Sequence, residues 1–130
     1  MSTELERAYD KKCSECDQLQ KELKKLRAGP REYGFLRCPS GFHVAFKNGY
    51  TVSVQFGVAN YCDAQNLRPG ALEESLAMEY WSAGTAEVAV KHKREFVRTP
   101  FNDGDDVIGH CTAEDVFAIM AWAMSQPRMF

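Results

Sequence analysis

The chain has 130 residues, 45% of them hydrophobic, and a formal net charge of −2, so it can bury one core but has no basic excess. That charge gives no reason to expect a nucleic-acid polymer as a partner. No stretch reaches the roughly 20 apolar residues of a membrane span, and nothing resembles a signal peptide. With five cysteines, an odd number, reduced thiols and a cytoplasmic location are expected, and no membrane partner.

A long amphipathic helix is predicted for residues 3–28. Thr3 and Glu6 form a capping box, and Gly29-Pro30 ends the helix. Alternating spacings of four and three define a heptad seam, which consists of Leu5, Tyr9, Lys12, Cys16, Leu19, Leu23 and Leu26. Such a narrow stripe favours packing against another helix, so residues 1–31 are predicted to be an oligomerisation helix of a homo-oligomer. The alternative is a helix that lies on its own domain.

The next segment is predicted to form a β-hairpin. Apolar and polar residues alternate on both sides of Asn48-Gly49, which is a strong turn signal. A two-residue turn would place the apolar residues of the two strands on opposite faces of the sheet. A three-residue loop with Gly49 in the left-handed conformation pairs Val44 with Val52 and places them on one face. The sequence therefore predicts the three-residue loop.

Further alternation predicts a second hairpin, with strand 85–91, a turn near 92–94, and Phe96 and Arg98 on the return strand. Residues 33–38 are expected to add a short strand, and 78–81 to extend the strand at 85–91.

Thr112 is expected to cap a C-terminal helix whose residues are apolar nearly all round, so that the helix is largely buried against the sheet or another subunit. The predicted fold class is α+β: a four- to five-stranded antiparallel sheet with a packed C-terminal helix and a protruding N-terminal coiled-coil-like helix. Residues 32–130 would form the globular α+β ligand-binding domain.

Patterns typical of metal sites and catalysis are weak. Cys13 and Cys16 have CxxC spacing, but they lie inside the predicted helix without a second CxxC, which favours seam thiols over zinc. The acidic loop 102–106 lacks the ligand at position five of a calcium loop, where Val107 stands. It is therefore interpreted as a turn with Asx hydrogen bonds or as a ligand-facing loop. No nucleophile, phosphate-loop or dinucleotide motif is present, so we expect no metal, no cofactor and no enzyme.

The basic turn 91–94 is interpreted as a solvated hairpin tip, with attraction of a phosphate ligand as the alternative. The connection 57–84 is longer than the ~12–15 residues of ordinary connections. Its Tyr and Trp side chains offer stacking faces for a base, and its Arg offers a fork for phosphate. We expect specificity for a ligand to be built on this loop. The alternative is a loop folded over the sheet as cover.

Four segments together resemble a pattern of small bacteriophage proteins: "NGYTVSVQFG", "NYCD", "TAEVAV" and "GDDVIGHCTAEDVFAIM". The resemblance covers residues 42–125 and is closest to the phage anti-defence sponges that sequester the cyclic ADP-ribose isomer made by Thoeris-type enzymes. Residues 64–84 and the basic turn depart from that pattern. The resemblance implies a non-enzymatic protein in the host bacterial cytoplasm that binds a cyclic nucleotide immune signal, in some members a cyclic oligonucleotide. It also implies a symmetric oligomer with pockets at subunit junctions.

Under this hypothesis the ligand-binding residues are Asn60, Tyr61, Asp63, Arg68, Trp81, Phe96, Arg98, Asn102, Asp105 and Asp106. Aromatic rings would stack on the base, arginines would pair with phosphate, and the Asn and Asp side chains would bind ribose or base. The rival hypothesis is a phage protein-protein inhibitor of a host defence complex, similar to anti-CRISPR proteins. In that case the N-terminal helix and the long loop would be the contact surfaces.

Overall fold

The computed structural model describes residues 15, 17–21 and 32–128. The chain divides into two units, Met1–Arg31 and Glu32–Phe130. In the first unit, residues 15 and 17–21 are helical, and Leu19 is exposed. The other predicted seam positions, Leu5, Tyr9, Lys12, Cys16, Leu23 and Leu26, lie outside the described residues. The heptad seam therefore stays a prediction.

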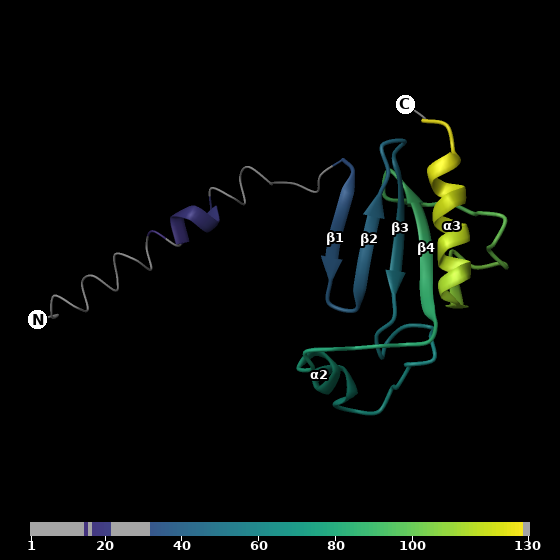
Figure 1. Ribbon diagram of the computed structural model, residues 1–130. Helices are drawn as coiled ribbons and strands as arrows, with labels where there is room; N and C mark the ends of the chain where they lie inside the picture. The colour runs from purple at the N-terminus through teal and green to yellow at the C-terminus, as the bar shows by residue number, and fades with distance from the viewer. Residues whose placement is uncertain (1–14, 16, 22–31, 129–130) are drawn as a thin grey trace, which may run out of the picture. The chain divides into compact units, whose positions relative to one another are not determined.

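The second unit is an α+β domain built on one antiparallel sheet (Figure 1). Its elements are β1 (Gly34–Cys38), β2 (Gly41–Ala45), β3 (Tyr50–Gln55), α2 (Ala71–Leu76), β4 (Ala86–His92), β5 (Glu95–Phe96), β6 (Val107–Cys111) and α3 (Ala113–Ser125). Strands β1 to β4 follow one another across the sheet, and β5 and β6 share the far edge of β4. Six strands form the sheet, against the four to five that were predicted. The strand that the sequence did not reveal is β6.

The register of the first hairpin confirms the three-residue loop. Val44 pairs with Val52. The N–H of Phe46 donates to the carbonyl oxygen of Tyr50 at 2.8 Å, and the N–H of Gly49 donates to that of Phe46 at 3.1 Å. Gly49 has a φ of 94°, in the left-handed region that a glycine adopts without strain. The apolar side chains of both strands therefore lie on one face.

The second hairpin is confirmed, but with a two-residue turn. Lys93 and Arg94 have φ values of 49° and 71°, which is the geometry that matches the twist of the flanking strands. β5 ends at Phe96, so the prediction that Arg98 belongs to the return strand was wrong. The predicted extension at 78–81 was also wrong, because the chain there leads from α2 back to the sheet without strand pairing.

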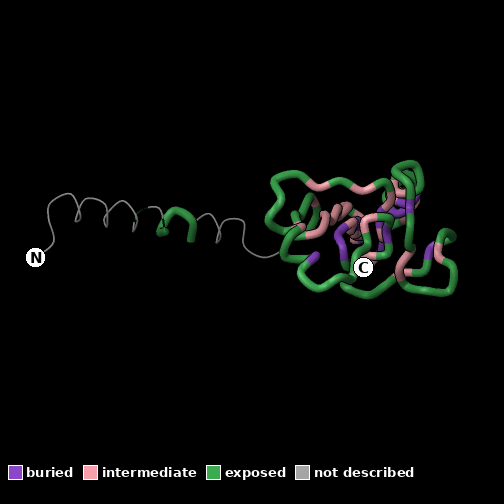
Figure 2. Tube along the Cα trace, turned by 90° about the horizontal axis from the view of Figure 1, so that it is seen from below, coloured by how far each residue is buried: buried purple, intermediate pink, exposed green. Residues whose placement is uncertain are grey.

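One face of the sheet carries the core. Thr112 and Asp115 form a reciprocal capping box that begins α3. Ile119 and Ala123 of α3 are fully buried, and they pack with apolar residues of β3 and β4: Tyr50, Val52, Val54, Ala86, Val88 and Val90. Figure 2 shows the buried residues inside the unit, with exposed loops around them.

The composition of α3 predicted a helix that is largely buried, but one side of the helix is exposed. Phe117 is 75% exposed and Met124 is 61% exposed. The reason is that α3 packs with one side on β3, β4 and β6, and no other described element covers its outer side. Among the described residues, no helix is long and apolar enough to cross a bilayer.

Candidate functional site

The start of the long loop is held by the side chains that were predicted to bind ligand. The carboxylate of Asp63 accepts from the N–H of Gly84 at 2.9 Å and from that of Thr85 at 3.2 Å. The side-chain oxygen of Asn60 accepts from the N–H of Gly57 at 2.9 Å. The indole N–H of Trp81 donates to the carbonyl oxygen of Phe56 at 2.8 Å. These polar groups are therefore used to shape the loop.

Tyr61 and Arg68 lie in different parts of the same loop. The backbone N–H of Tyr61 donates to the carboxylate of Glu87 at 2.7 Å, and the residue is 56% exposed. Arg68 pairs with Glu74 of α2 at 2.6 Å, and both side chains are exposed. Val58 and Cys62 are buried, but neither belongs to the core cluster of the sheet and α3, so the alternative of a loop folded over the sheet stays a prediction. In Figure 1, the part around α2 lies beyond the ends of the strands.

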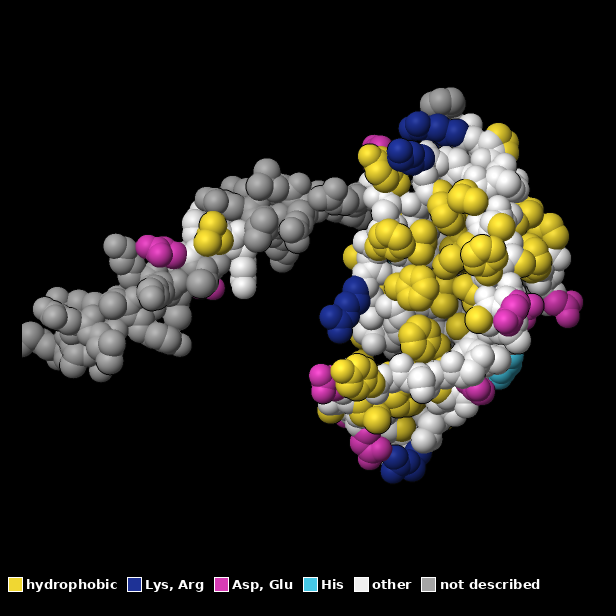
Figure 3. Space-filling view, in the orientation of Figure 1, with side chains coloured by type: hydrophobic (Ala, Val, Ile, Leu, Met, Phe, Trp, Pro, Cys, Tyr) yellow, Lys and Arg dark blue, Asp and Glu magenta, His cyan; other side chains and the backbone are white. Residues whose placement is uncertain are grey.

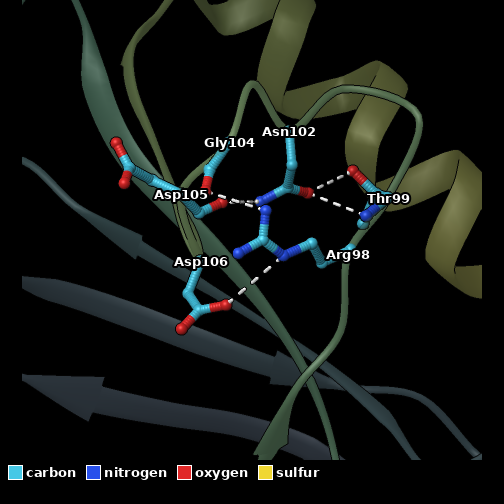
Figure 4. A network of polar contacts seen from close by, with 6 residues as sticks. All are labelled: Arg98, Thr99, Asn102, Gly104, Asp105 and Asp106. Atoms are coloured by element: carbon cyan, nitrogen blue, oxygen red, sulfur yellow. Dashed lines mark hydrogen bonds and ion pairs between the residues drawn. The ribbon is translucent and has the colours of Figure 1, made fainter.

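The loop 98–106 forms a second, closed group (Figure 4). The guanidinium of Arg98 donates to the carbonyl oxygen of Gly104 at 2.8 Å and lies 3.9 Å from the carboxylate of Asp106. The side-chain oxygen of Asn102 accepts from both the N–H and the hydroxyl of Thr99, at 2.8 and 2.7 Å. Its amide donates to the carbonyl oxygen of Asp105 at 2.8 Å. This network supports the interpretation of the segment as a turn with Asx hydrogen bonds.

Phe96 stands apart from both groups. Its ring lies 4.8 Å from the ammonium of Lys91, to which it is paired across β4 and β5. The structure thus brings Asn60, Tyr61, Asp63 and Trp81 together in one loop, and Arg98, Asn102, Asp105 and Asp106 in another. In the described part of the chain no hydrogen bond or ion pair joins the two loops.

Two titratable groups of the sheet have shifted pKa values. Burial, and secondarily the charge of Lys91, lowers the pKa of His43. Burial, and secondarily Asp115, raises the pKa of the Cys111 thiol to about 11. Cys111 is therefore protonated at neutral pH, which is the unreactive form of a thiol. Within residues 15, 17–21 and 32–128, no group of three or more His, Cys, Asp or Glu side chains is placed to hold a metal.

One surface feature is apolar, and the sequence interpretation missed it. α3 packs on β3, β4 and β6, so the same face of β1 and β2 has no described helix over it. Phe35, on that face in the row of Val44 and Val52, is 86% exposed. We define the open face as the core-side residues of β1 and β2 with the outward stripe of α3: Phe35, Phe42, Val44, Phe46, Phe117, Ala121 and Met124. Figure 3 shows hydrophobic side chains gathered over this side of the unit.

A signal for the open face was present in the sequence. Phe35 lies one strand before the predicted hairpin and pairs with Val44, so the apolar face of the sheet extends into β1. A helix of 13 residues covers only part of such a face. The apolar outer side of α3 pointed to the same incomplete burial.

Comparisons with family models, curated proteins and solved structures give no match to this chain. The functional argument therefore rests on the geometry of the domain.

Proposed function

We propose that this protein is a protein-binding module whose working surface is the open face. The observation that carries the proposal is Phe35, an aromatic residue that is 86% exposed beside half-buried Phe42 and Phe46. A contiguous apolar patch on a folded domain commonly marks an interaction site. Burial of each such side chain is worth about 1.5–3 kcal/mol, so a few of them can hold a partner.

The proposal gives the protein a binding role and no catalytic one. In this it agrees with the protein-inhibitor hypothesis from the sequence. It differs from that hypothesis in the surface, because the open face is formed by β1, β2 and α3 and not by the long loop. Sequestration of a cyclic nucleotide stays a second prediction. Its support is the resemblance of four segments to phage sponges, together with the exposed rings of Tyr61 and Phe96.

The test uses adjacent residues of β1 that point to opposite sides of the sheet. Phe35 lies on the open face, whereas Leu36 is exposed on the other side of the same strand. Immobilised full-length protein and its Phe35→Glu and Leu36→Glu variants would be exposed to bacterial lysate and to the protein itself. A partner retained by the wild type and by Leu36→Glu but lost by Phe35→Glu is the expected result. Equal retention by all three proteins would refute the assignment of this surface.

The nucleotide prediction is tested separately by a thermal-shift screen against cyclic ADP-ribose isomers and cyclic di- and trinucleotides. A bound ligand raises the unfolding free energy by about 2.7 kcal/mol at a hundredfold excess over Kd. Mass spectrometry of ligand released by heat would show whether the nucleotide is returned intact, as a sponge requires. No shift with any nucleotide would remove this second candidate and leave the protein-binding proposal unchanged.

A further inference from the structure

We propose that the partner of the open face is the open face of a second copy of this chain, in a symmetric dimer whose twofold axis runs parallel to the strands. In this dimer α3 of each copy lies on β1 and β2 of the other. The inference rests on the proposed function and names its partner. It concerns the unit Glu32–Phe130 alone.

The shape of the open face, with a raised helix on one half of the sheet and bare strands on the other, fits this arrangement. α3 stands over one half of the sheet, on β3, β4 and β6, and the half formed by β1 and β2 is bare. A twofold axis parallel to the strands exchanges these halves, so the raised helix of one copy meets the bare strands of the other. Such a contact is isologous, because each copy uses the same patch. The result is two sheets with two helices between them, in which each sheet face is covered along its whole width.

The outward stripe of α3 and the row of residues along β1 also agree in length. Glu114, Phe117, Ala121 and Met124 form one outward stripe of α3, at intervals of three and four residues, opposite the buried Ile119 and Ala123. At 1.5 Å per residue this stripe spans about 15 Å. Tyr33, Phe35 and Arg37 are alternate residues at the sheet edge, and four residues of strand span about 14 Å. The two rows are thus equally long.

Both rows also lie at the same height along the strands. Arg37 pairs with Phe42, and the row continues through Val54 and Val88. α3 begins directly after Cys111, which pairs with Ala86 beside that row. At its other end, α3 is fixed beside the β2–β3 turn, because the Asn48 amide donates to the carbonyl oxygen of Ala123. A twofold axis parallel to the strands preserves height, so Arg37 meets Glu114, and Phe35 meets Phe117.

The charges select this axis over the perpendicular one. Arg37 and Glu114 are both exposed, and neither has an ion-pair partner among the described residues. The proposed axis places Arg37 of one copy against Glu114 of the other, twice per dimer. A twofold axis across the strands would instead bring Arg37 toward the end of the sheet where Lys47 lies over the ring of Tyr33. Like charges would meet there, and like charges at an interface are unfavourable.

The apolar area is sufficient for a stable contact. Of the open face, Phe35 and Phe117 are 86% and 75% exposed, Met124 is exposed by more than half, and the remaining members are partly or largely exposed. Tyr33, next to this face at the sheet edge, is also exposed by more than half. With 150–250 Å² for an aromatic side chain, each copy would bury about 700 Å². A standard specific interface buries about 800 Å² per partner.

Sedimentation equilibrium of the full chain tests the dimer by reversal of charges. Arg37→Glu and Glu114→Arg should each weaken the dimer about tenfold, because each creates two like-charge contacts. The double variant Arg37→Glu/Glu114→Arg should restore the wild-type Kd. Lys93→Glu, in the exposed β4–β5 turn, is the matched control and should leave Kd unchanged. Circular dichroism and Tm would confirm that every variant is folded.

A second comparison separates this dimer from association through residues 1–31. Phe35→Glu should abolish the dimer and Leu36→Glu should not. An assembly that is insensitive to Phe35→Glu, a wild-type monomer at micromolar concentration, or a double variant without rescue would each overturn the inference. A wild-type monomer that still captures a lysate protein through Phe35 would overturn the dimer while the proposed function stands.

Discussion

The side-chain amide of Asn48 donates to the carbonyl oxygens of Ala123 and Gln126, at 2.7 and 2.8 Å, and so ties the first hairpin to the end of α3. The same residue also accepts from the N–H of Tyr50 at 3.1 Å. The Ala123 carbonyl also accepts from the backbone N–H of Gln126 at 3.3 Å, and Gln126 follows the last residue of α3. Asn48 therefore adds side-chain donors at the end of the helix, where carbonyl groups lack the usual partners. One side chain thus shapes a turn and caps a helix that is far away in the sequence.

Replacement of Asn48 should separate these two roles. Asn48→Asp keeps the acceptor for the Tyr50 N–H but loses the donors, and it places a negative charge at the negative end of α3. We expect both Asn48→Asp and Asn48→Ala to lower the free energy of unfolding, by about 2 kcal/mol. Urea denaturation measures this loss. Full stability of Asn48→Asp would show that the bonds to α3 contribute nothing.

The carboxylate of Asp63 should contribute to stability rather than to ligand affinity. Asp63→Ala removes the acceptor for the N–H groups of Gly84 and Thr85, and we expect a loss of about 1 kcal/mol. Asp63→Asn keeps one acceptor oxygen and should lose less. The measurement is urea denaturation, with limited proteolysis of residues 64–84 as a readout of the loop. Unchanged stability of Asp63→Ala, with weaker binding of a nucleotide, would instead support the ligand role.

Stability should fall in mild acid because of His43. Its pKa is lowered in the folded state by burial and by Lys91, so the unfolded chain takes up a proton first. The contribution is present above the ordinary value of 6.5 and is lost as pH falls through the folded pKa. His43→Gln should make the loss of stability below about pH 6.5 shallower. Titration of the imidazole by NMR checks the cause, and a folded pKa at or above 6.5 would contradict it.

The thiol of Cys111 should be unreactive in the native protein. It is buried, and its pKa of about 11 leaves little thiolate at pH 8. In a Cys13→Ser/Cys16→Ser background, alkylation by iodoacetamide should modify half-buried Cys38 first and Cys111 only after unfolding. Mass spectrometry of peptides gives the order. Early modification of Cys111 in the folded protein would mean that β6 opens locally.

The turn of the second hairpin should be improved by residues that prefer its backbone. Lys93 and Arg94 both have positive φ, which costs roughly 1 kcal/mol for a residue with a side chain. Lys93→Asn/Arg94→Gly should therefore raise the free energy of unfolding by about 1 kcal/mol, since Asn-Gly favours this turn. The readout is the urea midpoint. A lower midpoint would show that the basic side chains stabilise the fold.

The sequence was sufficient for elements whose local signals agree. Alternation around Gly49 gave the hairpin and its register, and Thr112 gave the start of α3. β6 was missed because its residues, which include Gly109, show no apolar–polar alternation. His110 has a positive φ, which departs from regular strand geometry. The pairing of β6 with β4 is also irregular between Ala86 and Val88. A strand of this kind forms because it pairs with a strand that is distant in the sequence, and local patterns do not reveal that pairing.

The candidate site was harder to predict from the sequence, because the type of a residue does not show whether its polar group binds a ligand or the protein's own backbone. Asn60, Asp63 and Asn102 have the chemistry of ligand contacts, but their oxygens accept from backbone N–H groups within a few residues or across the loop. The open face was missed for a different reason. Alternation identifies the side chains that share a face, but only the packing of α3 shows how much of that face remains bare.

The long connection between β3 and β4 has a consequence for the kinetics of folding. β1, β2 and β3 are joined by short turns, so this meander closes only small loops as it forms. β4 can pair with β3 only when the loop of residues 56–85 has closed. The chain loses conformational entropy in this closure before the contacts between the two strands can stabilise it. α3 can dock only afterwards, since it rests on β4 and β6 as well as on β3. The closure of this loop is therefore expected to set the folding rate, and shortening residues 64–84 should accelerate folding.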